Sequence, residues 1–187
     1  PVASVFLTLR LLSRLIGPSV PASRSCWRIP LFEESVPLVL DCRVEAETAA
    51  RSSPCFAHEP RVHVPQTLPQ LSAARVLTME YIDGVKISDA AGIAALGLER
   101  QQLEIASLVS RVFSAMAFAH GFVHCDPHPG NLLVRRGGGG EAQLVLLDHG
   151  MYRELDEGFR AQYCKLWASL LVSDHATAKE AATALGG

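Results

Sequence analysis

A long periodic segment near the middle of the chain most constrains the fold. Residues 98–121, LERQQLEIASLVSRVFSAMAFAHG, repeat apolar side chains at helical spacing and end in a glycine. Such a stripe predicts a helix packed on a core, and Gly121 suits the left-handed residue that ends a helix. The predicted apolar face comprises Leu103, Ala106, Leu108, Val109, Val112, Phe113, Met116 and Ala117.

The next ten residues, FVHCDPHPGN (122–131), cannot continue this helix because they contain two prolines. Three explanations compete for so many reactive side chains: a metal site, a phosphate-handling loop or an ordinary polar turn. His120, His124 and His128 have helical spacing, but the prolines prevent one helix from carrying all three. Their spacing also matches no standard zinc arrangement, so a structural zinc site is disfavoured.

Two short apolar runs follow, NLLV (131–134) and QLVLLD (143–148), on either side of four glycines at 137–140. This pattern predicts a β-hairpin. A phosphate-binding P-loop would need Lys-Ser/Thr and a helix after the glycines, whereas Glu141 and a strand follow here. The rest of the chain predicts two amphipathic helices joined near Ser173-Asp174.

Upstream of the long helix, acidic residues followed by a late Arg51 predict a helix over about 39–52. The segments RVHVP (61–65) and ARVLTMEYI (74–82) are rich in residues that favour strands. The order of helix, two strands, long helix, loop, hairpin and helices predicts an α+β fold.

Composition narrows the functional classes. A net charge of −2 and a pI near 6.4 argue against a general nucleic-acid-binding protein, which usually carries a basic field. The five cysteines include no C-x-x-C pair, which is typical of reduced thiols. No apolar run approaches the roughly 18 residues that a membrane span needs.

The first 32 residues are rich in Arg and Ser and contain no acidic residue. Organelle transit peptides share this composition. An ordinary helix followed by a linker at 17–30 is the favoured explanation, because transit peptides begin at an initiator Met and this sequence begins at Pro1.

Spacing within the loop favours phosphoryl transfer. Asp126 and Asn131 are five residues apart, as are the Asp and Asn of the kinase catalytic loop H-R-D-x-x-x-x-N. Asp148-His149-Gly150 ends the hairpin, where the D-F-G motif would lie. A lone Asp beside a proline would most simply tie its own turn, but these ordered elements together indicate an active-site carboxylate. His124 is expected to brace the loop by hydrogen bonding.

The segments HCDPHPGNLLV…LVLLDHG, PLVLDCRVEAETAAR and RVLTMEYIDG resemble the UbiB/aarF/ADCK family of atypical protein-kinase-like proteins over about residues 31–187. The resemblance implies a protein-kinase-like fold, mainly its helical C-lobe. It implies that ATP and Mg²⁺ are the cofactors and that Asp126 is the catalytic-loop carboxylate. By the same resemblance, Asn131 and Asp148 hold Mg²⁺, Glu45 is the helix-C glutamate, and Glu80 and Ile82 are the hinge residues for adenine.

The sequence also departs from that family. Its only lysines are Lys86, Lys165 and Lys179, so none precedes Glu45, and the K-x-G-Q segment is absent. His149 replaces the Phe of D-F-G, and Cys125 the Arg of H-R-D. We therefore expect the chain to be a fragment that lacks most of the N-lobe. We also expect Glu45, without a lysine partner, to turn to solvent.

Together with the resemblance, these patterns imply three parts: a helix and linker at 1–30, a partial N-lobe with helix C and hinge at 31–83, and a C-lobe at 84–187. The resemblance implies an ATPase or unorthodox kinase that supports isoprenoid quinone or lipid metabolism, associated with a mitochondrial or plastid membrane. Lipid or quinone precursors would be its partners, and nucleic acid would not. Two alternatives remain open: a catalytically inactive pseudokinase or scaffold, and a small-molecule phosphotransferase of the aminoglycoside or choline kinase type.

Overall fold

The computed structural model describes Thr8 and residues 41–186 of the chain. The helix and linker expected within 1–30 therefore lie almost entirely outside the described residues. The α-helices and strands, in chain order, are α3 (Cys42–Ser52), β1 (Val62–His63), β2 (Val85–Lys86), α4 (Ala90–Ala95), α5 (Gln102–Ala115), β3 (Phe122–His124), β4 (Leu132–Arg136), β5 (Ala142–Leu146), β6 (Tyr152–Glu154), α6 (Glu157–Leu171) and α7 (His175–Ala184).

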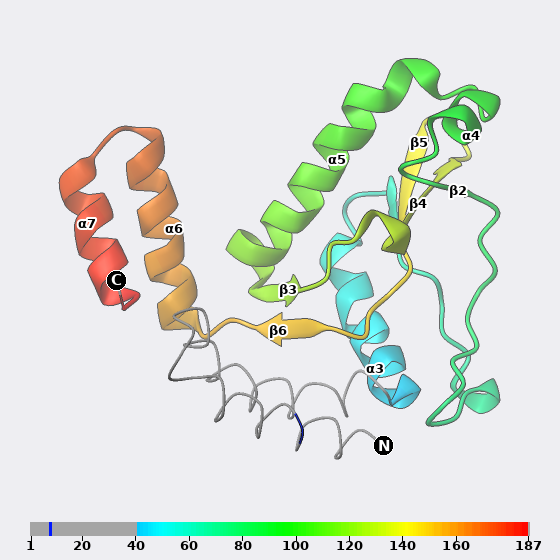
Figure 1. Cartoon of the computed structure of the whole chain (residues 1–187), viewed down its shortest axis with the longest axis horizontal. Helices are drawn as coiled ribbons and strands as arrows, with labels where there is room; N and C mark the ends of the chain where they lie inside the picture. Colours follow the sequence, from blue (N-terminus) through cyan, green and yellow to red (C-terminus); the bar gives the residue numbers. More distant parts are fainter. Residues whose placement is uncertain (1–7, 9–40, 187) are drawn as a thin grey trace.

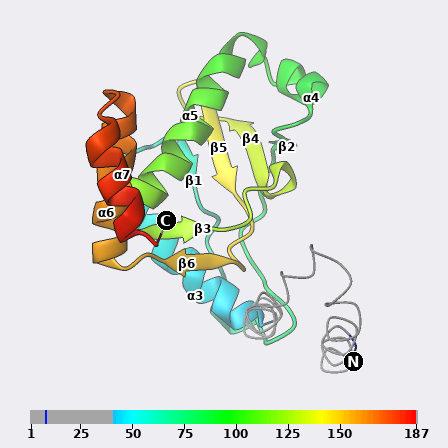
Figure 2. The ribbon, with the colours of Figure 1, turned by 60° about the vertical axis from the view of Figure 1, so that its left-hand side comes forward.

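A four-stranded sheet in the order β1-β5-β4-β2 forms the centre of the fold (Figures 1 and 2). The predicted hairpin is confirmed: β4 and β5 pair antiparallel, with Leu132 opposite Leu146 and Arg135 opposite Gln143. Strand β1 pairs parallel to β5, which places Val62 opposite Leu144. Because side chains alternate across a strand, the sheet has one apolar face and one face that carries polar residues.

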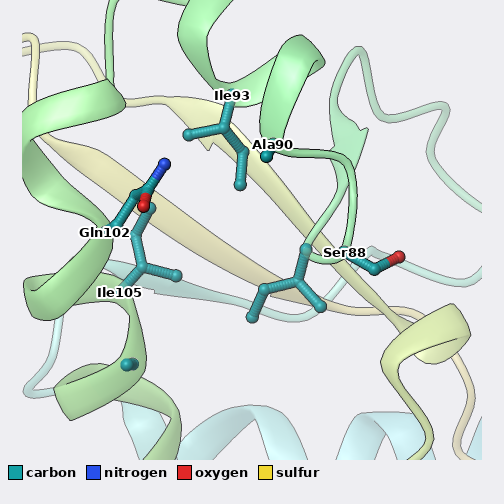
Figure 3. A pocket seen from close by; sticks show the side chains of 7 residues that line it. Ser88, Ala90, Ile93, Gln102 and Ile105 are labelled. Atoms are coloured by element: carbon teal, nitrogen blue, oxygen red, sulfur yellow. The ribbon is translucent and has the colours of Figure 1, made fainter.

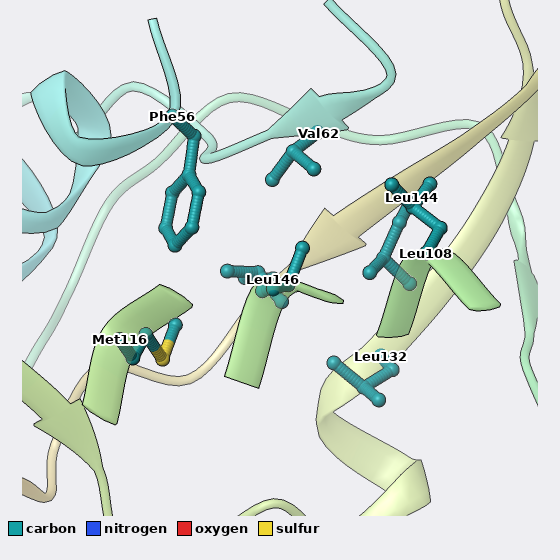
Figure 4. Close-up of a cluster of buried hydrophobic side chains, with 8 residues drawn as sticks. Phe56, Val62, Leu108, Met116, Leu132, Leu144 and Leu146 are labelled. Atoms are coloured by element: carbon teal, nitrogen blue, oxygen red, sulfur yellow. The ribbon is translucent and has the colours of Figure 1, made fainter. Parts of the chain in front are cut away.

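The apolar face of the sheet packs on α5 (Figure 4). Met116 is 1% exposed, and Leu144 and Leu146 are equally buried. Burial of one such side chain contributes about 1.5–3 kcal/mol, so this cluster is the main stabilising contact of the sheet. Its members are Phe56, Val62, Leu108, Val112, Met116, Leu132, Leu144 and Leu146.

The long helix is confirmed, with two irregular ends. A 3₁₀ turn (Glu99–Gln101) precedes α5, and a π-helical turn (Met116–His120) follows it. Gly121 then ends the helix in the left-handed conformation at φ 64°, as the sequence predicted. Leu103, expected on the buried face, is instead 86% exposed, whereas Ile105, two residues later, is 4% exposed and packs against Val134 and Ala142 of the sheet.

The expectation that no segment could span a bilayer needs correction. Within the described residues, the continuous helix Glu99–His120 is long and apolar enough by length and composition. Leu108, Val112 and Met116 of this helix lie in the core against the sheet. We therefore interpret it as a core helix.

A two-stranded ribbon, β3 paired antiparallel with β6, connects the end of the long helix to α6 (Figure 1). Helices α6 and α7 lie side by side beyond this ribbon, as both ribbon views show. Asp156 caps α6, and Asp174 caps α7 by accepting from the Thr177 amide, which confirms the predicted junction.

The two strands predicted before residue 83 are mostly wrong. Only Val62–His63 of segment 61–65 is a strand, and segment 74–82 makes only isolated bridges, Thr67 with Met79 and Ala73 with Val76. Two backbone bonds, from the Leu68 amide to Thr78 and from the Glu80 amide to Gln66, flank the first bridge. Side chains limit its extension: the Thr78 amide donates to Ser72 Oγ at 2.9 Å, and Thr78 Oγ1 donates to the Leu71 carbonyl at 2.7 Å. Ser and Thr compete in this way with regular strand pairing.

Candidate functional site

The loop after β3 is held by its own side chains. The Asp126 amide donates to His124 Nδ1 at 3.1 Å, so His124 braces the loop as predicted. The Asp126 carbonyl accepts from the His128 amide at 2.7 Å and from Asn131 Nδ2 at 3.4 Å. The Asp126 carboxylate is exposed and accepts no hydrogen bond within the described residues. The prolines and these bonds therefore fix the backbone and leave the carboxylate available to a ligand.

The structure brings Asp148 to the same end of the hairpin as Asn131. The Leu147 amide donates to the Asn131 carbonyl at 2.9 Å, which joins the end of β5 to the start of β4. The Gly150 amide donates to Asp148 Oδ1 at 2.8 Å and fixes that carboxylate. Asn131 Nδ2 donates to the Asp126 carbonyl, and the Asn131 amide oxygen accepts no hydrogen bond within the described chain.

These oxygens fit a magnesium site. Mg²⁺ is usually held by one or two carboxylates together with phosphate oxygens and waters, rather than by a cage made only of protein. Asp148 and Asn131 supply a carboxylate and an amide oxygen of that kind. The described residues contain no group of three or more His, Cys, Asp or Glu that could hold a metal.

His149 anchors the Asp148 turn in the core. Its side chain is 2% exposed; Nε2 lies 3.0 Å from the Leu146 carbonyl and Nδ1 lies 3.2 Å from Ser52 Oγ. Nε2 therefore carries a proton, and burial lowers the pKa of the ring to about 4, so it is neutral at pH 7. His149, Tyr152 and His124 stack, with ring centroids 5.5 Å apart for the first pair and 4.9 Å for the second.

The expectation that Glu45 turns to solvent is wrong. Glu45 is half-buried on α3, and its Oε1 accepts from the His149 amide at 3.4 Å. Burial raises the pKa of Glu45, and the nearby Asp148 charge raises it further, against the hydrogen bond from His149. The His149 amide thus keeps the Glu45 carboxylate facing the Asp148 turn.

The residues predicted as the hinge lie beside Arg135, near the opposite end of β4 from Asn131. Ile82 is buried and Tyr81, between the two predicted hinge residues, is 88% exposed. The Glu80 amide donates to the Gln66 carbonyl at 2.8 Å. Neither the Glu80 carbonyl nor the Ile82 amide makes a hydrogen bond within residues 41–186. These are the two peptide groups that the sequence predicted to meet adenine, and that role remains a prediction.

Two cavities of about 220 Å³ each lie away from the loop. Ile93 of α4 and Ile105 of α5 line the first, with Gln102 and Ser88 at its edge (Figure 3). Phe56, Leu108 and Val112 line the second, beside Cys55. Neither cavity includes a predicted site residue.

Sequence reasoning missed the residues that attach α3 to the site. Ser52 lies under His149, and Arg51 lies 4.5 Å from the centroid of the Phe122 ring while pairing with Glu154 at 3.1 Å. No local pattern marks them, because their partners lie about 70–100 residues later in the chain. His149 is the one residue of this group that a local pattern marks. A histidine at the apolar position of D-F-G indicates a buried side chain with a hydrogen-bonding partner.

The chain matches a family of atypical kinase-like proteins. The family model of the ABC1 atypical kinase-like domain matches residues 2–182. AarF domain-containing protein kinase 1 of Mus musculus is 38% identical over 184 residues, which is 96% of this chain and 34% of the mouse protein. "Probable serine/threonine-protein kinase abkB" of Dictyostelium discoideum is 37% identical over 89% of this chain and 25% of that protein. The chain thus spans about a third or less of these two relatives.

A solved structure shares the fold. A Mycobacterium tuberculosis protein in complex with erythromycin superimposes with a TM-score of 0.69 and 22% sequence identity, over 96% of this chain and 44% of that one. The predicted α+β, kinase-like fold class is therefore confirmed.

Proposed function

Because the chain belongs to the ABC1 atypical kinase-like family, we propose that it contributes the Mg–ATP site of an unorthodox kinase or ATPase. The observation that carries this proposal is the fixed placement of Asp126, Asn131 and Asp148 around one hairpin end. The Asp126 carboxylate, the Asn131 amide oxygen and Asp148 Oδ2 accept no hydrogen bond within the described residues. Catalysis of phosphoryl transfer consists mainly of positioning and electrostatic stabilisation, which such an arrangement can supply.

Each residue has a distinct role in this proposal. Asp148 and the Asn131 amide oxygen hold Mg²⁺, which when bound neutralises charge on the phosphate oxygens. The exposed Asp126 carboxylate orients the attacking hydroxyl or water and accepts its proton. The Glu80 carbonyl and the Ile82 amide bind the adenine edge. Glu45, bound to the His149 amide, keeps α3 against the Asp148 turn.

A magnesium-dependent thermal shift tests this function. The chain is titrated with ATP with and without Mg²⁺, beside Asp148→Asn. Ligand that binds only the native state stabilises it by about 2.7 kcal/mol at one hundred times Kd. We expect a Mg-dependent rise in Tm that Asp148→Asn abolishes. Asp174→Asn is the matched control, because asparagine also caps a helix well and this cap lies on α7. An equal shift in Asp148→Asn and the parent chain would contradict the proposal.

We further propose that the whole protein serves isoprenoid quinone or lipid metabolism at a mitochondrial or plastid membrane. The family resemblance supports this assignment. Imaging of the fluorescently tagged full-length protein and its co-flotation with vesicles test it; a protein found only in the soluble cytosol would contradict it.

A catalytically inactive scaffold is the second candidate. It is favoured by Glu45, whose carboxylate accepts from the His149 amide and is thus already engaged within the described residues. Single-turnover assays with labelled ATP separate the two candidates, because a scaffold that binds nucleotide produces the thermal shift but no released or transferred phosphate.

A further inference from the structure

The Glu80 side chain joins three separate parts of the chain. Its Oε2 lies 2.8 Å from His63 Nε2 on β1 and accepts from the Gln66 amide at 3.3 Å. Its Oε1 lies 3.7 Å from Arg135 Nη1 on β4, an ion pair rather than a close hydrogen bond. These partners hold the pKa of Glu80 below its usual value in spite of partial burial, so the side chain is a carboxylate at neutral pH.

Arg135 is itself fixed by the sheet. Its Nε donates to Gln143 Oε1 on β5 at 2.7 Å, and Gln143 Nε2 donates to the Pro60 carbonyl at 2.7 Å. Since Arg135 pairs with Gln143 and His63 pairs with Val145 across the strands, these side chains share the face opposite to the apolar core. A continuous set of polar contacts therefore crosses this face from Pro60 to Glu80.

The main chain of Glu80–Ile82 makes one hydrogen bond within residues 41–186, while the Ile82 side chain is buried and the Thr78 carbonyl just before it accepts from the Leu68 amide at 2.8 Å. Segment 74–82 has only isolated bridges, and Tyr81 is almost fully exposed. Glu80 itself makes one main-chain hydrogen bond within residues 41–186, from its amide to the Gln66 carbonyl. The direction of the Glu80 carbonyl therefore depends on how its side chain is held.

We infer that His63 and Arg135 are positioning residues that fix the hinge through the Glu80 side chain and thereby set a preference for adenine over guanine. This inference rests on the proposed nucleotide site. Adenine has an amino donor at the position where guanine has a carbonyl acceptor. A fixed carbonyl and amide form hydrogen bonds with the adenine edge, whereas guanine leaves them unpaired. Polar sites discriminate strongly between ligands in this way. A hinge that can reorient loses that discrimination.

The experiment measures Kd for Mg–ATP and Mg–GTP on the full chain by calorimetric titration. The disruptive variants are His63→Leu and Arg135→Met. His63→Gln is the conservative variant, because its amide can still donate to Glu80. Arg100→Met is the matched control, an exposed arginine with no polar contact in the described chain. Tm and circular dichroism confirm that each variant is folded.

We expect the disruptive variants to weaken ATP binding about five- to tenfold, the loss expected for one hydrogen bond or ion pair, with GTP binding changed less than twofold. His63→Gln should restore the ATP/GTP ratio to within about twofold of the parent value. A purely structural role would lower both affinities equally.

An unchanged ATP/GTP ratio in folded His63→Leu and Arg135→Met would overturn the inference and leave the proposed function standing. Equal binding of ATP and GTP by the parent chain would do the same. Failure of the parent chain to bind either nucleotide would overturn both.

Discussion

Different kinds of interaction stabilise the two ends of the proposed site, which are the loop end around Asp126 and Asp148 and the hinge end around Glu80. At the loop end, His149 is almost fully buried and neutral, and its contacts are a carbonyl, a hydroxyl and two aromatic rings. At the hinge end, Glu80, His63 and Arg135 keep between 25% and 36% of their side chains exposed. Salt has little effect on buried neutral contacts, but protonation of the buried histidine disrupts them. Partly exposed ion pairs are individually weak and are screened by salt. The loop end should therefore dominate stability, and the hinge end should mainly control ligand choice.

The largest effect should come from removal of the His149 ring. His149→Ala deletes a stacked side chain and leaves the Leu146 carbonyl without its partner, so we expect a loss of about 3 kcal/mol in the free energy of unfolding. Urea denaturation measures it. His149→Phe keeps the ring stack and should lose only about 1–2 kcal/mol. Equal losses for the two variants would show that the hydrogen bonds, not the stacking, hold this turn.

Acid should act on the same end of the site. His149 titrates near 6.5 when unfolded and at about 4 when folded, so the unfolded state binds more protons between these values. The stabilisation by the neutral ring is therefore complete above pH 6.5 and is lost as pH falls towards 4. The total loss in the free energy of unfolding from this group is about 3 kcal/mol. Burial shifts the pKa of His124 in the same direction. Denaturant midpoints between pH 4 and 7 measure the slope, and His149→Phe should flatten it; an unchanged slope would contradict this assignment.

Glu45→Gln should raise the free energy of unfolding, by less than His149→Ala lowers it. The substitution keeps an oxygen that can accept from the His149 amide and removes a negative charge beside Asp148. Because the side chain is half-exposed and water screens it, we expect a gain below about 1 kcal/mol at pH 7. The gain should shrink as pH falls, because the raised pKa means that the native glutamate gains protons before the unfolded one. Chemical denaturation at pH 7 and 5 tests this, and a destabilised variant would show that the charge itself is needed.

The smallest effect should come from the exposed attachment of α3. Glu154→Gln removes the ion pair with Arg51 but leaves Arg51 over the Phe122 ring. Exposed pairs of this type contribute about 0–1 kcal/mol. Thermal unfolding in low and high salt measures it, with Lys179→Gln on α7 as an exposed control. A loss above about 1 kcal/mol would mean that this pair is not solvent-screened.

Sequence reasoning succeeded where local patterns decide the structure. Periodicity located the long helix, the glycines located the hairpin, and Asp174 located the start of α7, because each depends on neighbouring residues. It failed for segment 74–82, where β-rich residues are overruled by Ser72 and Thr78 side-chain bonds. It also failed for Glu45, because its acceptor role depends on an amide more than a hundred residues later. Contacts of that range leave no trace in local spacing.

The parallel pairing of β1 with β5 has a consequence for the order of folding. The β4–β5 hairpin closes a short loop and can form early, whereas Val62 must find Leu144 across most of the described chain. Loop-closure entropy makes such distant pairing slow relative to local contacts. We expect β1 to dock late in refolding and to open early in native-state hydrogen exchange. His63 lies on this strand, so the contact that fixes the hinge would be assembled last and released first.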